Sequence, residues 1–479
     1  MNNGMIRFVL SWILRVEGLL MFLPCVIALV CREKEGWVYL ILAGIAVAAG
    51  LLLSKKPKNM EIYQKEGFVA VGLSWILLSC YGAIPFVITK EIPHFLNALF
   101  EIVSGFTTTG ASILTDVEAL SRTSLFWRSF SHWIGGMGVL VFILMLLPTG
   151  SGGSHMNLMR AESPGPEVTK FVPRVRATAR LLYKIYLGMT VIELILLLIT
   201  RMNWFDAFCI TFGTAGTGGF GVLNASCGTY TPAQQWIITI FMLAFGVNFG
   251  FYYLMITRKA AEAFKMEEVR GYLLIVLGAV ALISWNIYTA YDSVGHTIRD
   301  AAFQVASIIT TTGYSTTDFD LWPSLSKTIL LTLMMIGACA GSTGGGIKVS
   351  RVLIMVKEIK EEIRSLLHPR SIRKMRMDGH VVQEQTMRSV MAFLVAYFVL
   401  FWVSFMIISF DGFSIETNFS AVAATLNNIG PGLDAVGPTQ NYFAFGAVSK
   451  VVMIFDMLAG RLELLPIFVL LYPGTWKQH

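Results

Sequence analysis

Long apolar runs recur along the chain and predict membrane-spanning helices. A helix crosses the hydrocarbon layer of a bilayer with about 20 largely apolar residues. Uncharged runs close to that length are Gly36–Leu53, Gly67–Thr89, Gly271–Tyr291, Thr328–Ile347 and Ser389–Phe410. Two further runs, Phe8–Val30 and Lys184–Thr200, are similar but contain charged residues. The pattern predicts an all-α protein that crosses the membrane several times.

The longest uncharged stretch, from Ala207 to Thr257, cannot be a single helix. It contains 51 residues, and one helix of that length would extend about 77 Å, more than twice the membrane core. Its poorest helix-forming segment is Gly213-Thr-Ala-Gly-Thr-Gly-Gly-Phe-Gly221. We therefore expect the helix to break there.

Four Gly/Thr-rich breaks share one pattern: an apolar helix and a shorter amphipathic helix precede each break, and an apolar helix follows it. The breaks are Thr107-Thr-Thr-Gly-Ala-Ser112, Ala215-Gly-Thr-Gly-Gly-Phe220, Thr310-Thr-Thr-Gly-Tyr-Ser315 and Asn427-Asn-Ile-Gly-Pro-Gly432. Aligned on the fourth position, the equivalent glycines are Gly110, Gly218, Gly313 and Gly430, which are 108, 95 and 117 residues apart. We expect a helix pair at 1–60, followed by repeats at 61–160, 161–265, 266–375 and 376–479.

Four breaks at membrane depth indicate a pathway for a cation. Irregular backbone is tolerated there only where it lines protein or a water-filled space. Four equivalent breaks can meet on one axis, where backbone carbonyls replace the water shell of a cation and the preceding short helices direct their negative ends toward it. None of the four breaks contains Lys or Arg, which argues against an anion site. A single break could be a turn or a tight helix crossing, but four in register favour the pathway.

Composition supports a membrane protein and excludes several other classes. Charged residues are 14% of the chain, against about 25% in ordinary soluble domains, while hydrophobic residues are 55% and the mean hydropathy is +0.65. These values exclude a soluble enzyme, a disordered chain and a disulfide scaffold. The six cysteines are scattered without a C-x-x-C pair, so they imply neither a metal site nor a disulfide framework.

The net charge of +7 reports topology rather than nucleic-acid binding. Basic residues cluster at 55–65, 160–180, 258–270 and 348–388. All four clusters lie on one side of the membrane if the N-terminus is cytoplasmic, as the positive-inside rule requires. We therefore expect both termini in the cytoplasm. Contact with anionic lipid headgroups is compatible with the same clusters.

Acidic residues follow three of the four breaks and have two interpretations. They are Asp116, Glu118, Asp318, Asp320 and Asp434. They could raise the cation concentration at an outer mouth. The alternative is that they are ordinary solvated loop charges.

The run after Thr328 predicts a loop within the membrane. Gly344, Gly345 and Gly346 are adjacent, and each glycine destabilises a helix by about 1 kcal/mol relative to alanine. The alternative is a tight crossing of small residues. Lys348 either helps to hold this loop or anchors the chain at the cytoplasmic surface.

Arg461 lies inside the last apolar segment, Val451–Tyr472. A central arginine costs about 2.5–3.5 kcal/mol on insertion scales, so its side chain should face water or a partner. We expect Arg461 to face the cavity below the breaks and to repel cations until a gate moves. The alternative is a local ion pair with Asp456 or Glu463.

These features resemble the Trk/Ktr/HKT superfamily of potassium transporters, and within it the bacterial TrkH/TrkG proteins. Thr310-Thr-Thr-Gly-Tyr-Ser315 is similar to a potassium-channel filter. More specific similarities are Trp133-Ile-Gly-Gly-Met-Gly138, Arg160-Ala-Glu-Ser-Pro-Gly-Pro166, Ala340-Gly-Ser-Thr-Gly-Gly-Gly-Ile-Lys348, Asn427-Asn-Ile-Gly-Pro-Gly432 and Gly460-Arg-Leu-Glu463. The resemblance implies pseudo-fourfold M1–P–M2 repeats around a potassium pathway, an additional N-terminal transmembrane helix pair, and an intramembrane loop that blocks the pathway below its filter.

By position, the resemblance assigns three residues of each break to the potassium filter. They are Thr108, Thr109 and Gly110; Gly216, Thr217 and Gly218; Thr311, Thr312 and Gly313; and Asn428, Ile429 and Gly430. In the family, glycine at all four of the last positions accompanies potassium selectivity, and serine at the first accompanies sodium. The second and fourth breaks depart from Thr-Thr-Gly, which leaves open which oxygens contact the ion there.

The resemblance also implies a location and partners. It places the chain in the bacterial cytoplasmic (inner) membrane as a homodimer that carries K⁺. A cytoplasmic ring of TrkA type would bind nucleotide and gate the pathway, and no cofactor is expected on this chain. The segment Lys357–Arg376 is the candidate contact for that ring, with lipid contact as the alternative.

Two other function classes remain as alternatives. An intramembrane serine hydrolase needs a serine and a histidine that meet within the membrane. Ser342 and His132 are the available residues, although we expect His132 to be a satisfied helix histidine. A Na⁺- or H⁺-coupled transporter would place its site between inverted repeats. The repeats here all begin on the basic side, which favours a channel-like pathway but leaves coupling open.

Overall fold

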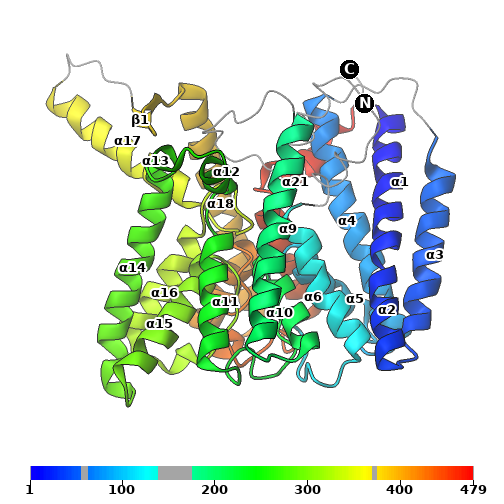
Figure 1. The fold of residues 1–479 in the computed structure, drawn as a ribbon. Coiled ribbons are helices and arrows are strands. Elements are labelled where there is room, and N and C mark those ends of the chain that lie inside the picture. Colours follow the sequence, from blue (N-terminus) through cyan, green and yellow to red (C-terminus); the bar gives the residue numbers. More distant parts are fainter. Residues whose placement is uncertain (1, 56–62, 139–174, 369–374, 478–479) are drawn as a thin grey trace.

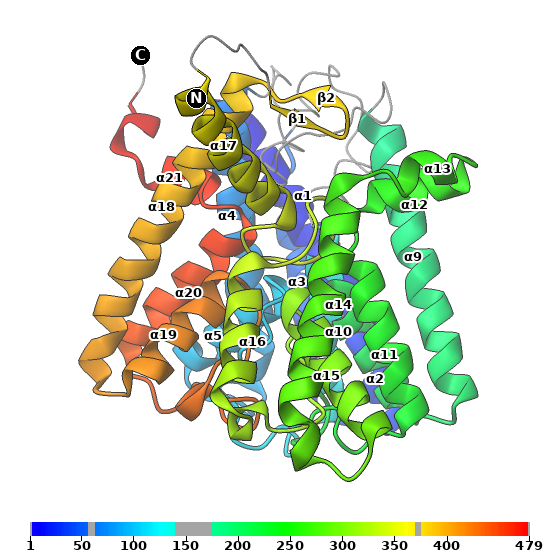
Figure 2. The same cartoon turned by 90° about the vertical axis from the view of Figure 1, so that its left-hand side faces the viewer.

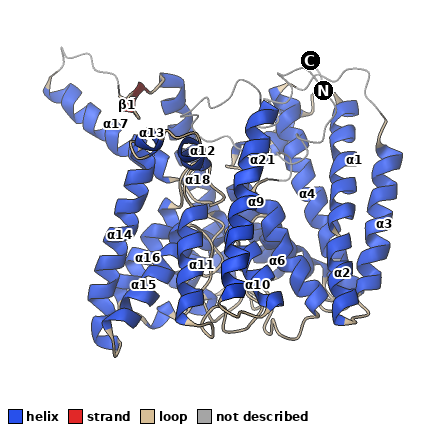
Figure 3. Ribbon diagram, in the orientation of Figure 1, coloured by secondary structure: helices blue, strands red, loops and turns tan. Residues whose placement is uncertain are grey.

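The computed structural model of the chain describes residues 2–55, 63–138, 175–368 and 375–477. These residues form a helical bundle with one short hairpin, β1 (Arg376–Met377) and β2 (His380–Val381), as Figures 1 and 3 show. The predicted motif Arg160–Pro166, part of the basic clusters and two of the predicted repeat boundaries lie outside the described residues. The all-α architecture agrees with the apolar pattern of the sequence.

The N-terminal helices form a group of their own, beside the rest of the bundle. They are α1 (Asn3–Leu20), α2 (Phe22–Cys31) and α3 (Gly36–Leu53). The predicted run Phe8–Val30 is interrupted once, at Met21, and α3 has the predicted bounds. Both α2 and α3 pack on neighbouring helices of this group, and α1 packs on α3 and α4 (Figure 1).

Four helical units follow, each with a long helix, a short helix that ends at a break, and a third helix. Their helices are α4 (Gln64–Ile88), α5 (Phe95–Phe106) and α6 (Arg122–Gly136); α9 (Val175–Ile199), α10 (Trp204–Gly216) and α11 (Pro232–Phe245); α14 (Glu267–Ile287), α15 (Val294–Ile309) and α16 (Ser324–Ile336); and α18 (Glu384–Ile408), α19 (Ile415–Leu426) and α20 (Ala447–Arg461). All four short helices end at the predicted Gly/Thr-rich segments.

The contacts between units follow a closed circle. Each short helix packs on the third helix of the unit before it: α10 on α6, α15 on α11, α19 on α16, and α5 on α20. The last contact joins the fourth unit back to the first. The four breaks are therefore directed toward a common region of the bundle.

In the second, third and fourth units the third helix is shorter or more irregular than its apolar run predicts. In the second unit the chain bends by 92° between α11 and α12 (Phe249–Ile256), a break that the sequence analysis did not predict. In the third unit α16 stops at Ile336, and the glycine-rich loop follows. In the fourth unit a turn at Glu463 and Leu464, both with positive φ, separates α20 from α21 (Leu465–Leu471).

The long helices have the length and surface of membrane spans. In the described residues six helical segments pass length and hydropathy criteria for a span, or seven if the bent pair α11–α12 counts as one. Their outer faces are apolar: on α14, Leu274, Leu277 and Trp285 are 70%, 66% and 75% exposed. Such faces are stable against lipid rather than water.

The first helix begins, and the last described residues end, on the same side of the bundle (Figure 1). That side also carries α12, α13 (Ala260–Ala263), α17 (Val349–Leu367) and the hairpin, as Figures 1 and 2 show. The connections from α10 to α11 and from α15 to α16 lie toward the opposite side.

Candidate functional site

The four breaks share one backbone conformation. Each has a left-handed residue with φ between 55° and 58°, followed two residues later by a glycine with φ between 76° and 100°. The left-handed residues are Thr108, Thr217, Thr311 and Asn428, and the glycines are Gly110, Gly219, Gly313 and Gly430. The N–H of the residue between them donates to the carbonyl five residues earlier, at 2.8 Å in all four breaks. The positive φ explains the glycines, because side chains strain that conformation.

This shared conformation corrects the alignment of the second break by one residue. The sequence pattern aligns Gly218 with the other three glycines, whereas the structure gives the equivalent φ to Gly219. The residues equivalent to Thr108–Gly110 are thus Thr217–Gly219, and Gly216 is the last residue of α10. Two adjacent glycines make the two registers indistinguishable from the sequence pattern alone.

The breaks meet as a closed ring, hereafter the glycine ring. Each of its glycines lies so close to a backbone carbonyl of the next break that an added Cβ would overlap or crowd that oxygen. The pairs, glycine first, are Gly110 and Gly218, Gly219 and Thr312, Gly313 and Ile429, and Gly430 and Thr109. The order follows the sequence, and the fourth break closes on the first.

A cavity of about 140 Å³ opens beside the glycine ring. All four ring glycines line it, together with residues from the loops that follow the breaks. Asn224, Thr439, Gln440 and Asn441 supply polar groups, and none of its described lining residues is acidic.

The acidic residues that follow the breaks fasten neighbouring loops to one another. Asp116 accepts a hydrogen bond from the side-chain amide of Asn224 at 2.8 Å, and Glu118 accepts from the backbone N–H of Asn224 at 2.9 Å. Asp318 accepts from the hydroxyl of Thr439 at 3.2 Å. Each bond joins loops of consecutive units, so these carboxylates have a structural role at the cavity rim.

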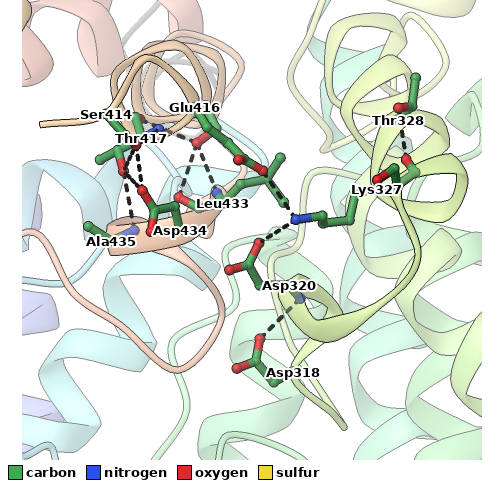
Figure 4. Close-up of polar contacts among 12 residues, drawn as sticks. Asp318, Asp320, Lys327, Thr328, Ser414, Glu416, Thr417, Leu433, Asp434 and Ala435 are labelled. Atoms are coloured by element: carbon green, nitrogen blue, oxygen red, sulfur yellow. Dashed lines mark hydrogen bonds and ion pairs between the residues drawn. The ribbon is translucent and has the colours of Figure 1, made fainter.

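Acidic residues also join the third unit to the fourth. The Lys327 ammonium lies 3.4 Å from a carboxylate oxygen of Asp320 and 3.3 Å from one of Glu416, while Asp434 accepts from Ser414 (Figure 4). Asp320 is paired with a cation, whereas hydrogen bonds from neutral groups do not remove the charge of a carboxylate, so these contacts do not decide between the two interpretations of the acids.

The side chains behind the breaks differ from one unit to the next. In the first break the hydroxyls of Thr107 and Thr109 are 2.8 Å apart, and in the third those of Thr310 and Thr312 are 2.7 Å apart. In the fourth break the Asn428 amide donates to the Thr109 hydroxyl at 2.9 Å. The common backbone is thus supported by different side-chain contacts.

The predicted glycine loop occupies residues 337–348, between α16 and α17, and it lies against two of the breaks. The N–H of Gly345 donates to the Thr311 hydroxyl at 2.7 Å. An added Cβ at Gly345 would approach Asn428 to 3.2 Å, and one at Gly344 would approach the Thr310 carbonyl to 2.9 Å. Because Gly344 and Gly345 have no side chains, the loop can lie this close to the third and fourth breaks.

Two buried charged residues hold the glycine loop. The Lys348 ammonium donates to the carbonyl of Gly344, which agrees with the loop-holding interpretation of this lysine. Glu268, which the sequence analysis did not single out, accepts from the N–H groups of Ala340 at 2.6 Å and Ser350 at 3.1 Å. In the sequence Glu268 stands at the start of an apolar run, where a charge at the membrane interface is common. The sequence alone therefore does not indicate that Glu268 holds the loop.

Arg461 connects the end of α20 to the glycine loop and to α6. Its guanidinium donates to the carbonyls of Thr343 and Gly136, at 2.9 Å each, and to the carbonyl of Gly135. The two acids named as local alternatives have other partners. Asp456 accepts from a serine on α18, and Glu463 pairs with an arginine on α17.

The geometry does not support a serine hydrolase. The Nδ1 of His132 lies 2.7 Å from the carbonyl oxygen of Gly105, and its Nε2 accepts from the N–H of Phe220 at 3.2 Å. Ser342 donates to the carbonyl of Cys339 at 2.6 Å. Since both ring nitrogens are engaged with backbone groups, His132 is the satisfied helix histidine that the sequence analysis expected.

Comparisons with known proteins agree over nearly the whole chain. A family model described as "TrkH: Cation transport protein" matches residues 38–474. The Trk system potassium uptake protein TrkH of Salmonella typhimurium is 36% identical, with 97% of this chain and 99% of that protein covered. TrkG of Escherichia coli (strain K12), described in the same terms, is 34% identical over the full length of both chains. The crystal structure of the potassium transporter TrkH from Vibrio parahaemolyticus superposes with a TM-score of 0.89 at 30% identity, with all of both chains covered.

Proposed function

Because the chain belongs to the TrkH family of cation transport proteins, we propose that it carries potassium into the bacterial cytoplasm through the glycine ring. The four helical units are then M1–P–M2 repeats around one pathway. The observation that carries the proposal is the closed contact of four equivalent breaks beside one cavity. Membership in a transport family also agrees with the expectation that the chain is not an enzyme.

The filter of this pathway consists of backbone oxygens. Its residues are Thr108, Thr109 and Gly110; Thr217, Gly218 and Gly219; Thr311, Thr312 and Gly313; and Asn428, Ile429 and Gly430. Carbonyls on a narrow ring replace the hydration shell of an entering ion. The short helices α5, α10, α15 and α19 all end at the ring, so their negative ends stabilise a cation there.

Transport is passive and inward in this scheme. A negative-inside potential contributes about 2.3 kcal/mol per charge for each 100 mV. Basic segments on the side of the two termini support a cytoplasmic location for both ends, so potassium enters from the cavity side.

The glycine loop and Arg461 form the gate. The loop contacts the third and fourth breaks, and Arg461 holds it through the Thr343 carbonyl. A guanidinium beside the pathway also raises the energy of a cation there. Opening then requires movement of residues 337–348, together with the groups that hold them, Lys348 and Glu268.

The cytoplasmic side offers a surface for a regulatory partner. We propose a homodimer that docks on a nucleotide-binding ring of TrkA type. α17 supports this, because it lies on the side of the termini and carries Lys357, Lys360 and Arg364 (Figure 2).

Ion flux into liposomes tests the proposal. The chain alone, and then with its nucleotide-binding partner, should admit Rb⁺ at least about tenfold faster than Na⁺. The variant Gly278→Ala should keep this flux, since a Cβ added to this glycine of α14 meets nothing within 4 Å. It is the matched control for glycine-to-alanine changes in the glycine ring. Flux no greater than in empty liposomes, or equal flux of the two ions, contradicts the proposal. Uptake that stops when a Na⁺ or H⁺ gradient is removed shows a coupled transporter instead.

A further inference from the structure

The second break lacks the side chains that support the first and third. Thr107 and Thr109 pair through their hydroxyls, as do Thr310 and Thr312. Under the corrected alignment the corresponding pair in the second break is Gly216 and Gly218. A break without these side chains needs another support, because it adopts the same strained left-handed conformation.

His132 fills the space of both missing side chains. A Cβ added to Gly218 would overlap the imidazole, and it would lie 2.6 Å from Cε1. A Cβ added to Gly216 would overlap the backbone carbonyl of His132. One turn of α6, in the first unit, thus occupies the position that threonines occupy in the first and third breaks.

The imidazole is fixed in one orientation. It is fully buried, with Nδ1 and Nε2 bonded respectively to the Gly105 carbonyl and to the Phe220 N–H. Because a backbone N–H donates to Nε2, the proton must be on Nδ1, which defines the neutral tautomer. The ring also packs on Phe220, with 4.3 Å between the ring centroids. His132 therefore ties the short helix of the first unit to the second break.

A buried ion pair one turn earlier on α6 supports the same connection. Arg128 pairs with Glu101 at 2.5 Å and donates to the Gly221 carbonyl at 2.9 Å. Its guanidinium lies over the Phe220 ring, 3.6 Å from the centroid. Phe220 and Gly221, which follow the second break, are thus contacted directly by side chains of α6.

We propose that His132 and Gly218 are a matched pair, in which the imidazole replaces threonine as the support of the second break and sets the preference for K⁺ over Na⁺. His132 is a positioning residue, because it acts through the backbone of residues 217–220. The inference rests on the proposed function, since it concerns the selectivity of the same ring.

Two single variants and their combination test the pair through the Rb⁺/Na⁺ flux ratio. His132→Ala removes the support, and Gly218→Thr adds a side chain where the imidazole stands. Each should lower the ratio about tenfold, the effect of losing a buried hydrogen-bonded contact. The double variant restores a threonine as in the first and third breaks, and it should recover more than half of the wild-type ratio. A histidine that only stabilises the fold would change the amount of assembled protein but not the Rb⁺/Na⁺ flux ratio of the protein that assembles.

The outcomes separate this inference from the proposed function. If wild-type liposomes show no selective flux, the proposed function fails. If the wild type is selective but both single variants match it, or the double variant is no better than the worse single variant, the matched pair is refuted. Where neither single variant assembles, the double variant decides: it must assemble and select Rb⁺, and failure to do so refutes the pair.

Discussion

The first and third breaks each contain a pair of bonded threonine hydroxyls, whereas the second and fourth lack such a pair and are held by other contacts. Thr107 with Thr109, and Thr310 with Thr312, pair within one break. The second break rests on a histidine from the first unit, and the fourth bonds to the first through Asn428. All four breaks nevertheless share one backbone conformation. The comparison indicates that the four breaks repeat one backbone geometry, while the side chains that hold this geometry differ from break to break.

Replacing a glycine of the glycine ring with alanine should have the largest effect on ion flux, in a break with a threonine pair or in one without. Gly313 has a φ of 86°, and a Cβ there would overlap the Ile429 carbonyl. Gly313→Ala should reduce Rb⁺ flux by about 100-fold, since strain of about 1–3 kcal/mol adds to the overlap. Gly278→Ala controls for the substitution itself. Near-normal flux in Gly313→Ala would mean that the ring is not the pathway.

Release of the glycine loop should have the next largest effect. The loop contacts the third break at Thr311 and the fourth break at Asn428, and Arg461 holds the loop. Arg461→Ala removes the bond to the loop and a positive charge, so flux of the chain without partner should rise about tenfold. Arg461→Lys keeps the positive charge, so its flux should lie between those of the wild type and Arg461→Ala. Unchanged flux and unchanged gating would exclude this role of Arg461.

The fourth break should be sensitive to its bonds with other elements. The Asn428 amide donates to the Thr109 hydroxyl and to the Met457 carbonyl, at 2.9 Å each. Asn428→Ala loses both bonds, and the Rb⁺/Na⁺ flux ratio should fall about tenfold. If the ratio is unaffected, the bonds of Asn428 to the first break and to α20 do not support the fourth break, and the comparison is wrong for it.

The third break should tolerate the loss of its own hydroxyl pair better. Thr312→Val keeps the shape of the side chain but removes the bond to Thr310, whose hydroxyl keeps its bond to the Ala306 carbonyl. The expected decrease of the flux ratio is about threefold, since one net hydrogen bond contributes about 0.5–1.5 kcal/mol. The informative measurement compares this variant with Asn428→Ala under the same conditions. A larger effect in Thr312→Val than in Asn428→Ala would reverse the expected order.

The smallest effect concerns the outer loop of the fourth unit and depends on pH. The hydroxyls of Ser414 and Thr417 donate to Asp434 and lower the pKa of its carboxyl (Figure 4). A lowered folded-state pKa stabilises the fold above the unfolded-state pKa, and this stabilisation is lost as pH falls through the folded-state pKa. Ser414→Ala should raise the pKa of Asp434 and move the acid limb of thermal stability to slightly higher pH. In the background Asp434→Asn, Ser414→Ala should produce no such shift.

Local patterns predicted much of this architecture, and long-range contacts supplied the rest. The breaks and the loop at Gly344–Gly346 follow from runs of poor helix formers. The register at Gly218 and Gly219 does not, because the two glycines are equivalent until the next break fixes them. The roles of His132 and Glu268 depend on partners 88 and 72 residues away, which a local pattern does not contain.

In the proposed mechanism, the four breaks bind a dehydrated potassium ion on their common axis. The most direct test is a crystal structure with Rb⁺ in place of K⁺, using the anomalous scattering of rubidium to locate the ion. The account predicts anomalous density within the glycine ring, surrounded by carbonyls from all four breaks. An empty ring, with rubidium bound elsewhere along the chain, would contradict it.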